Sequence, residues 1–314
     1  MDVLSDILSK LKLSGTLYFR TSFTAPWSIQ VPAYMNVSRF HYAHKGNCFV
    51  RVAADQPAVS LVQGDLLIIQ KGASHTLFCD PKTEHQAVQL DRVVELSGFK
   101  GEGTLVFGEL ETNHETQLIC GHFAFDKNAS HFLIDALPTY IHIKNYGEAA
   151  GSWLENTLKV IGNEAGRGRM GSSLIALKLS EIIFTQALRT YLLHEGKDAP
   201  VLAAFADPGI AAALTEFHKS PANPWTLDML AKVAGMSRTA FTNRFSKYMT
   251  TTPLGYITHW RMQLARQQLE NSSEALITIA ESVGYHSESA FSRVFKKHHN
   301  QAPATYRHAS WAMA

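Results

Sequence analysis

Residues 227–256 read LDMLAKVAGMSRTAFTNRFSKYMTTTPLGY, and residues 276–306 read LITIAESVGYHSESAFSRVFKKHHNQAPATY. The two stretches align when one residue is inserted after the glycine that they share. The aligned positions are Leu227, Leu230, Ala231, Ala234, Gly235, Ser237, Ala240, Phe241, Phe245, Lys247, Pro253 and Tyr256, which recur as Leu276, Ile279, Ala280, Val283, Gly284, Ser287, Ala290, Phe291, Phe295, Lys297, Pro303 and Tyr306. The chain therefore contains one structural unit twice.

Each copy has the pattern of two helices joined by a tight turn. Apolar residues three and four positions apart predict a helix on either side of Gly235, and Ser237 is a residue type that often begins a helix. We expect helices over 227–234 and about 238–248, an arrangement typical of a helix-turn-helix, whose second helix can lie in the major groove of DNA. The alternative is two unrelated helical hairpins with the same core spacing, which agreement at a dozen positions disfavours.

A long helix should connect the two copies. Pro253 is suited to begin it, and the helical pattern continues to about Glu270. A helix of about sixteen residues spans roughly 24 Å. It can hold two DNA-reading helices a fixed distance apart, as successive major grooves about 34 Å apart require.

The charge of the chain is unevenly distributed. The whole sequence has 29 Lys and Arg against 27 Asp and Glu, but Pro221–His308 has ten against five. A positive balance is what contact with phosphate groups requires, although a solvated basic face would be weak support by itself. The basic excess coincides with the repeated units.

Residues that face away from the paired phenylalanines are the candidates for contact with DNA. In the first copy they are Arg238, Thr239, Thr242, Asn243, Arg244 and Lys247, and in the second they are Glu288, Ser289, Ser292, Arg293, Lys296, Lys297 and Arg307. Arg293 is the strongest candidate for base reading, because a guanidinium can bond O6 and N7 of guanine together. Lys296, Lys297 and Arg307 are candidates for phosphate contact. For each basic residue the alternative is a solvated surface charge, and Asn243 can bond adenine or make a local helix contact.

The stretch ESVGYHSESAFSRVFKKHHNQAPATYR (281–307) resembles the signature of AraC/XylS-type transcription regulators, and residues 207–308 resemble their tandem helix-turn-helix domain. The resemblance implies that the second helix of each copy enters one of two adjacent major grooves. It also implies base contacts by Thr239, Thr242, Asn243, Ser289, Ser292 and Arg293. Asn300 stands where the family usually has Gly, and Asn tolerates the left-handed conformation. Thr250, at the equivalent place in the first copy, is less suited to it.

The first half of the chain has a different sequence pattern. Between about residues 16 and 143, short apolar runs with Gly, Pro, Asp and Asn between them predict strands of a sandwich or barrel. The predicted strands are Ile29–Met35, Cys48–Val52, Ala58–Leu61, Leu66–Gln70, Ala87–Glu95 and Thr116–Phe125. The fold class is therefore α+β.

Helical spacing begins near Gly151, with predicted helices over Ser152–Val160 and Ser172–His194. The second is apolar around so much of its circumference that we expect it to be covered on more than one side, including by a second subunit. Residues 195–200 form a short polar break. We expect a sensor domain over 1–195, whose residues from about 151 form linker and dimerisation helices, and a DNA-binding domain over 205–310.

Residues Gly64–His75 resemble the second cupin motif, with Gln70 where Pro is usual, and Phe40–Gly46 resemble the hairpin entry of the same jelly-roll barrel. Residues 25–27, 118–126 and 134–143 resemble the cupin sensor domain of one subgroup of AraC-type regulators. The resemblance implies a cupin-like β-barrel (jelly roll) with a helical linker, followed by an all-α tandem helix-turn-helix domain.

Four residues are candidates for a sensor site in this barrel: His41, His75, Cys120 and His122. Cupins often bind a metal through a His-x-His pair and a Glu that follows it. This pattern is missing here, and Arg39 stands where the Glu would be, which argues against a cupin dioxygenase or isomerase. The four candidates can converge inside a barrel, since alternate strand residues face inward, and a thiolate with imidazoles would favour a divalent metal such as Zn. The alternatives are ordinary buried histidines with an inert cysteine, or an oxidant sensor, in which Cys120 should be exposed with a lowered pKa.

Composition limits where the chain works. Its start, MDVLSDILSKLKLSG, lacks a basic segment followed by an apolar run, so it does not read as a secretory signal. No stretch approaches eighteen apolar residues, and Cys48, Cys79 and Cys120 are too few and too scattered for a disulfide framework. We expect a cytoplasmic protein that does not bind membranes.

These observations together predict a transcription regulator rather than an enzyme. We expect it to bind double-stranded promoter DNA, as a homodimer, under the control of a small molecule, a metal or an oxidant sensed in the barrel. The resemblance implies contact with RNA polymerase, and activation rather than repression. One alternative is a metal-dependent cupin enzyme fused to a DNA-binding domain. Another is an architectural DNA binder without a ligand, which should show little preference between duplexes.

Overall fold

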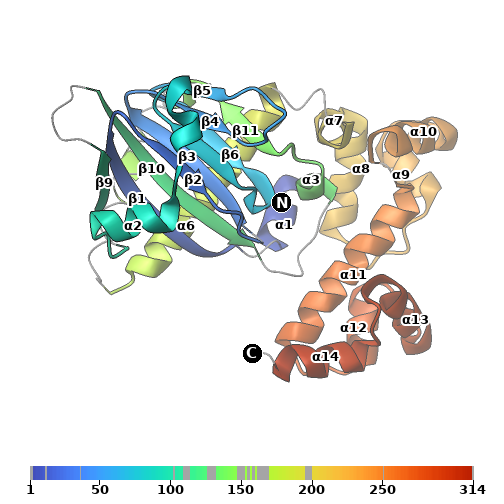
Figure 1. Cartoon of the computed structure of the whole chain (residues 1–314). Helices are drawn as coiled ribbons and strands as arrows, with labels where there is room; N and C mark the ends of the chain where they lie inside the picture. The colour runs from blue at the N-terminus through green and yellow to red at the C-terminus, as the bar shows by residue number, and fades with distance from the viewer. Residues whose placement is uncertain are drawn as a thin grey trace. The chain divides into compact units, whose positions relative to one another are not determined.

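The structure is a computed structural model that describes residues 3–10, 13–35, 37–101, 103–108, 114–125, 132–146, 170–194, 200–249 and 251–312, with isolated positions between 153 and 160. The chain divides into two compact units (Figure 1). The barrel unit contains the β-strands and helix α6 (Ser172–His194). The helical unit contains α1 (Val3–Lys10), α3 (Phe132–Asp135) and every described helix from α7 (Pro200–Ala206) onward.

The barrel unit is built from two sheets. The first has the order β11 (Tyr140–Ile143), β6 (Leu66–Ile69), β3 (Val37–Lys45), β10 (Glu115–Phe125), β1 (Leu13–Thr24) and β9 (Thr104–Gly108). The second has the order β5 (Val59–Leu61), β4 (Cys48–Arg51), β7 (His75–Phe78), β2 (Ser28–Val31) and β8 (Val88–Gln89). Neighbours pair antiparallel except β1 with β9 and β2 with β8. Residues of both sheets share one apolar core, which confirms the predicted cupin-like barrel.

The register of β3 against β10 decides which side chains face the interior. Arg39 lies opposite His122, and His41 lies opposite Cys120. Because side chains alternate along a strand, these four residues point to the same side of the sheet. His41 and Cys120 are buried there.

Asp65 shows why the motif from Gly64 folds as it does. Gly64 adopts a φ of 93°, which favours glycine, and the Asp65 side chain behind it is buried. Its carboxylate accepts hydrogen bonds from the backbone N–H groups of Val62 and Asn145 and lies 2.9 Å from Nε2 of His142. This carboxylate therefore fastens β11 to the turn before β6.

One predicted strand, Ala87–Glu95, is wrong over most of its length. Only Val88–Gln89 is a strand, and helix α2 (Leu90–Ser97) follows. Leu90, Val93 and Val94 have the spacing of a helix, and Gly98 ends it with a φ of 66°. The apolar content of the run concealed this helical period.

Helix α6 confirms the prediction for Ser172–His194. One side of it packs on the six-stranded sheet, where the ring centroids of Phe184 and Phe123 lie 5.1 Å apart. In the single chain, Leu174, Ile175 and Ile182 are exposed. The other predicted helix, Ser152–Val160, lies largely outside the described residues.

The helical unit contains the two predicted copies in sequence. The first copy is α9 (Leu227–Val233) and α10 (Arg238–Met249), preceded by α8 (Pro208–Lys219). The second copy is α12 (Leu276–Ser282) and α13 (Glu288–His299), followed by α14 (Pro303–Ala312). Helix α11 (Pro253–Asn271) connects the two copies, as Figure 1 shows.

The two copies match in geometry as well as in sequence. The ring centroids of Phe241 and Phe245 are 5.7 Å apart, and those of Phe291 and Phe295 are also 5.7 Å apart. A tyrosine from the helix that follows packs against the second ring of each pair, at 5.9 Å in the first copy and 5.6 Å in the second. The sequence repeat is therefore a repeat of the same packed core.

The start of the chain packs within the helical unit. In α1, Val3 and Ile7 are buried, and Asp6 Oδ2 lies 2.7 Å from Nδ1 of His218 on α8. The other ring nitrogen of His218 lies 2.8 Å from the Tyr256 hydroxyl. Burial lowers the pKa of His218, although Asp6 opposes the shift. The sequence pattern predicts these first residues as part of the sensor domain. It does not reveal the contact between Asp6 and His218, because these residues are far apart in the sequence.

The end of α13 gives a stability prediction. Asn300 adopts a φ of 58° after the helix, which confirms that it uses the left-handed conformation. Replacing Asn300 by Ala should lower the free energy of unfolding by about 1 kcal/mol, because a Cβ is strained there and Ala lacks the local hydrogen bonding of Asn. Asn300→Gly should match or exceed the wild type in urea unfolding. Equal losses in both variants would contradict a conformational origin.

Candidate nucleic-acid interface and ligand cavity

Helix α13 presents a polar row opposite its buried phenylalanines. Ser287 caps the helix by accepting a hydrogen bond from the backbone N–H of Ala290, and Phe291 and Phe295 are fully buried. The opposite face carries Glu288, Ser289, Ser292, Arg293, Lys296 and Lys297, of which only Ser292 is half-buried. No ion pair of Arg293, Lys296 or Lys297 is formed within the described part of the chain. Their charges are therefore available to a ligand.

Helix α10 presents the equivalent row in the first copy. Thr239, Asn243 and Lys247 are exposed at the positions that Ser289, Arg293 and Lys297 occupy in α13. The Thr242 hydroxyl donates to the backbone carbonyl of Arg238, so its hydrogen bond is satisfied within the helix. Only one of these rows has a guanidinium at its centre, which makes the two faces chemically distinct.

Two of the predicted contact residues have partners inside the protein. The Arg244 guanidinium lies 2.6 Å from Oδ2 of Asp207, whose carboxylate is almost fully buried and also caps α8 through Gly209 and Ile210. Arg307 donates to the carbonyl of Glu274 at 2.6 Å. Both side chains therefore hold helices together, and their availability to DNA is reduced.

Arg261 is a residue that the sequence reasoning missed. It lies on α11 and donates to the carbonyl oxygens of Pro221 and Asn223, at 2.8 and 2.6 Å. Its guanidinium also lies over the ring of Tyr285, 5.9 Å from the centroid. Arg261 thus joins the segment before the first copy to the turn of the second. A single arginine in a long helix carries no pattern that could have revealed this.

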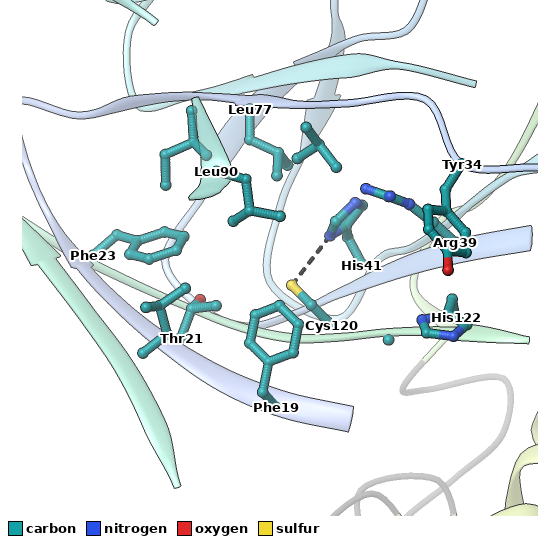
Figure 2. A pocket seen from close by; sticks show the side chains of 14 residues that line it. Phe19, Thr21, Phe23, Tyr34, Arg39, His41, Leu77, Leu90, Cys120 and His122 are labelled. Atoms are coloured by element: carbon teal, nitrogen blue, oxygen red, sulfur yellow. Dashed lines mark hydrogen bonds between the residues drawn. The ribbon is translucent and has the colours of Figure 1, made fainter. Parts of the chain in front are cut away.

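The barrel unit contains a cavity of about 310 Å³ (Figure 2). One end is apolar, with Phe23, Leu77 and Leu90 among its lining. The other end has Tyr34, Arg39 and His122, and Tyr34 is 61% exposed, so this polar end lies nearer to solvent. A volume of this size is at the lower limit of typical ligand pockets, which span about 300–1,000 Å³.

Three of the four predicted sensor residues form a series of hydrogen bonds, and two of them, His41 and Cys120, line the cavity. Nδ1 of His41 lies 3.1 Å from Sγ of Cys120, and Nε2 of His41 lies 2.8 Å from Nε2 of His75. Nδ1 of His75 lies 3.0 Å from the carbonyl oxygen of Ala73. His122 lines the cavity but takes no part in these hydrogen bonds.

The carbonyl at the end of this series assigns every proton in it. A carbonyl only accepts, so His75 donates from Nδ1 and accepts at Nε2. His41 must then donate from Nε2 and accept at Nδ1, which makes the Cys120 thiol a donor. Burial lowers the pKa of His75 to about 4 and that of His41 well below its usual value, and it raises the pKa of Cys120. All three groups are therefore neutral near pH 7.

This arrangement does not fit a metal centre. His41 turns one ring nitrogen to Cys120 and the other to His75, so the three side chains follow one another instead of meeting at a common point. Among the residues described, no group of three or more His, Cys, Asp or Glu is placed to hold a metal ion. The Cys120 side chain is also a poor match to an oxidant sensor, because it is 3% exposed and its pKa is raised rather than lowered.

Comparisons with known proteins agree with both units. The family described as Cupin matches residues 2–193, and the family described as Helix-turn-helix domain matches residues 230–309. An AraC-like transcription regulator of Streptomyces antibioticus is 32% identical over 98% of this chain and 98% of its own length. The chain belongs to the AraC-like transcription regulators.

Other members of the family match parts of this regulator. The RCS-specific HTH-type transcriptional activator RclR of Escherichia coli (strain K12) is 28% identical over 62% of this chain and 69% of its own length. The crystal structure of the DNA-binding domain of AdpA in complex with a target DNA is 28% identical and covers 34% of this chain and 96% of that chain, with a TM-score of 0.33. The two family matches and the full-length relative show that this AraC-like chain is a DNA-binding transcription regulator with an N-terminal cupin domain. None of its described helices combines the length and apolar composition that crossing a membrane requires.

Two basic residues of α10 in this AraC-like regulator should behave differently when neutralised. Arg244→Met should lower the free energy of unfolding by about 1–3 kcal/mol, because the buried carboxylate of Asp207 loses its charged partner. Lys247→Met, at an exposed position, should change it by less than about 0.5 kcal/mol. Lys247→Met should instead weaken binding to a random duplex and lower the salt slope by about 1 in fluorescence anisotropy titrations. A loss of stability in Lys247→Met without one in Arg244→Met would contradict these roles.

The series of hydrogen bonds from Ala73 to Cys120 predicts a loss of stability in acid. Below about pH 6.5 the unfolded state protonates His75, whereas the folded state does not until about pH 4. The free energy of unfolding of the barrel unit should therefore fall as the pH drops through this window, by about 3 kcal/mol for His75 alone. The loss of stability can be measured by hydrogen exchange of the backbone amides of β3 and β10 as a function of pH, corrected for their intrinsic exchange rates.

A pair of variants isolates the contribution of His75. His75→Phe should show a smaller loss of protection between pH 7 and pH 5 than the wild type. His44→Gln alters a histidine of β3 that takes no part in these hydrogen bonds, and it should keep the wild-type dependence. An unchanged dependence in His75→Phe would show that His75 is not the group responsible.

Proposed function

We propose that this regulator binds two successive major grooves on one face of a promoter duplex, through the outer rows of α10 and α13. The observation that supports this most strongly is the repeat itself, because each copy exposes its polar row at the same positions above an identical phenylalanine pair. Helix α11 has 19 residues and spans about 28 Å, a length comparable with the groove separation of about 34 Å. It is suited to hold the two rows one helical turn of DNA apart.

Base reading is proposed to rest mainly on the second copy. Arg293 is exposed at the centre of its row and is suited to bidentate bonding of a guanine, with Ser289 and Ser292 beside it. Thr239 and Asn243 would make weaker contacts in the first copy. Lys247, Lys296 and Lys297 are suited to phosphate contact, which positions the protein without reading sequence.

The signal is proposed to be a small, mainly apolar molecule bound in the cavity of the barrel unit. The size of the cavity and its apolar lining support this choice over a metal, for which the histidines do not converge, and over an oxidant, for which Cys120 is too deeply buried. We propose that the barrel binds its ligand without transforming it, since Arg39 replaces the carboxylate that a catalytic cupin would use.

The assembly is proposed to be a homodimer through α6, whose exposed Leu174, Ile175 and Ile182 form an apolar surface that a second copy can cover. The regulator is proposed to act in the cytoplasm. Activation through RNA polymerase is proposed because the family resemblance and the related activator RclR both favour it. The dimer can be tested by analytical ultracentrifugation of wild type and Ile182→Glu.

Arg293 provides the test of sequence reading. On a duplex selected from a random pool, Arg293→Ala should cost roughly 1–3 kcal/mol of binding free energy and relax the preference at one base pair. Lys296→Ala is the matched control, because it should weaken binding to selected and random duplexes alike. An equal loss for Arg293→Ala on both duplexes would show that this residue contacts only phosphate.

A further inference from the structure

The cavity of the barrel unit has a sharply uneven distribution of polar groups. Phenylalanines and aliphatic side chains line one end, and those of Phe23, Ile29, Leu77 and Leu105 are almost completely buried. The polar groups gather at the other end, around Arg39, as Figure 2 shows. A ligand that fills this cavity should therefore be apolar along its body and polar at one end.

Arg39 occupies an unusual position for a charged residue. It points inward from β3, directly opposite His122 on β10, and it is half-buried. Among the described residues no Asp or Glu belongs to the cavity lining, and none acts on the Arg39 guanidinium. Burial without a counter-ion disfavours a charge, which is why the pKa of Arg39 is lowered, but an arginine stays protonated nonetheless.

The histidines around Arg39 do not supply the missing negative charge, and they add no positive charge either. Burial is the main cause that lowers the pKa of His41, His75 and His122, and the nearby charge of Arg39 lowers each of them further. They are neutral at pH 7. Among the described residues that line the cavity, Arg39 therefore carries the one formal charge, and none of them is an anion.

We infer that the ligand of the cavity is an apolar molecule with a single carboxylate, which Arg39 binds through its guanidinium. The proposal rests on the proposed function of the barrel as a small-molecule sensor, and it specifies the chemical class. A planar guanidinium binds a carboxylate through two parallel hydrogen bonds. His122 and the Tyr34 hydroxyl lie at the same end of the cavity and can bond the carboxylate as well. The apolar body lies toward Phe23 and Leu77.

The volume of about 310 Å³ suits a short or medium apolar body rather than a long one. A neutral hydrocarbon would leave the half-buried charge of Arg39 unbalanced, and it would gain nothing from that residue. A dianion such as a phosphate monoester would bring a second negative charge that no lining residue balances. A monocarboxylate matches both the charge and the shape.

Calorimetric titration of the full-length chain with matched probes tests this inference. Octanoate, methyl octanoate and octan-1-ol share one apolar body and differ in the head group, and hexanoate and decanoate cover shorter and longer bodies. The wild type should bind its best carboxylate at least tenfold more tightly than the ester or the alcohol, because hydrogen bonds between two charged groups are stronger than those to a neutral group.

Two matched variants assign the effect to Arg39. Arg39→Met should lose roughly ten- to a hundredfold in affinity for the carboxylate and keep the affinity for the alcohol within threefold. Arg20→Met removes an arginine of strand β1 that does not line this cavity, and it should bind all probes as the wild type does. Circular dichroism spectra and melting curves of both variants verify folding.

The possible failures are distinguishable. If the alcohol binds as tightly as the carboxylate, or if Arg39→Met keeps its carboxylate affinity, the ligand class is wrong while the barrel remains a sensor of apolar molecules. If no probe of any class binds, the inference fails together with the proposed small-molecule sensing. Binding of a selected duplex, measured separately, shows whether the DNA-binding part of the proposed function still holds.

Discussion

The burial of two phenylalanines under each helix-turn-helix is the interaction on which the DNA-binding half depends. In both copies the rings lie 5.7 Å apart, and a tyrosine of the following helix closes the cluster. Because the two rings are four residues apart, their burial fixes the rotation of the helix about its axis. The same packing that stabilises each copy therefore turns Asn243 and Arg293 outward. Stability and recognition share one cause here.

In the barrel unit, the alternation of side chains along β3 and β10 has the corresponding role. It brings Arg39, His41, Cys120 and His122 to the interior in two cross-strand pairs. The hydrogen bonding of these residues differs because their neighbours differ. The Ala73 carbonyl sets the protons of His75 and His41 and keeps Cys120 a thiol, so that pair is internally satisfied. Arg39 has no such partner among the described residues, and its charge is left for a ligand.

The sequence predicted the helices of both copies and the helix between them, because the repeat gave the helices of each copy two independent signals. Helices α1, α3 and α7 of the same unit lie outside the repeat and were not predicted. The boundaries of α6 and the left-handed Asn300 also agree with their predictions. Contacts between distant segments could not be predicted. Asp207 with Arg244, Asp6 with His218 and Arg261 with the Pro221 carbonyl join residues that no local pattern relates. The inward position of His41 followed from alternation, but its bond to His75 depends on how the two sheets face each other. The significance of Arg39 was visible only once its surroundings were known.

Selection of duplexes by the full-length chain from a random pool, followed by sequencing, tests the central claim most directly. The claim is that each chain reads two major grooves at a separation that α11 fixes. The enriched duplexes should contain two short elements whose centres lie about 10 base pairs apart, one helical turn of DNA. A guanine should be preferred in the element read by α13. A single short element, elements at variable spacing, or no enrichment over the starting pool would contradict the account.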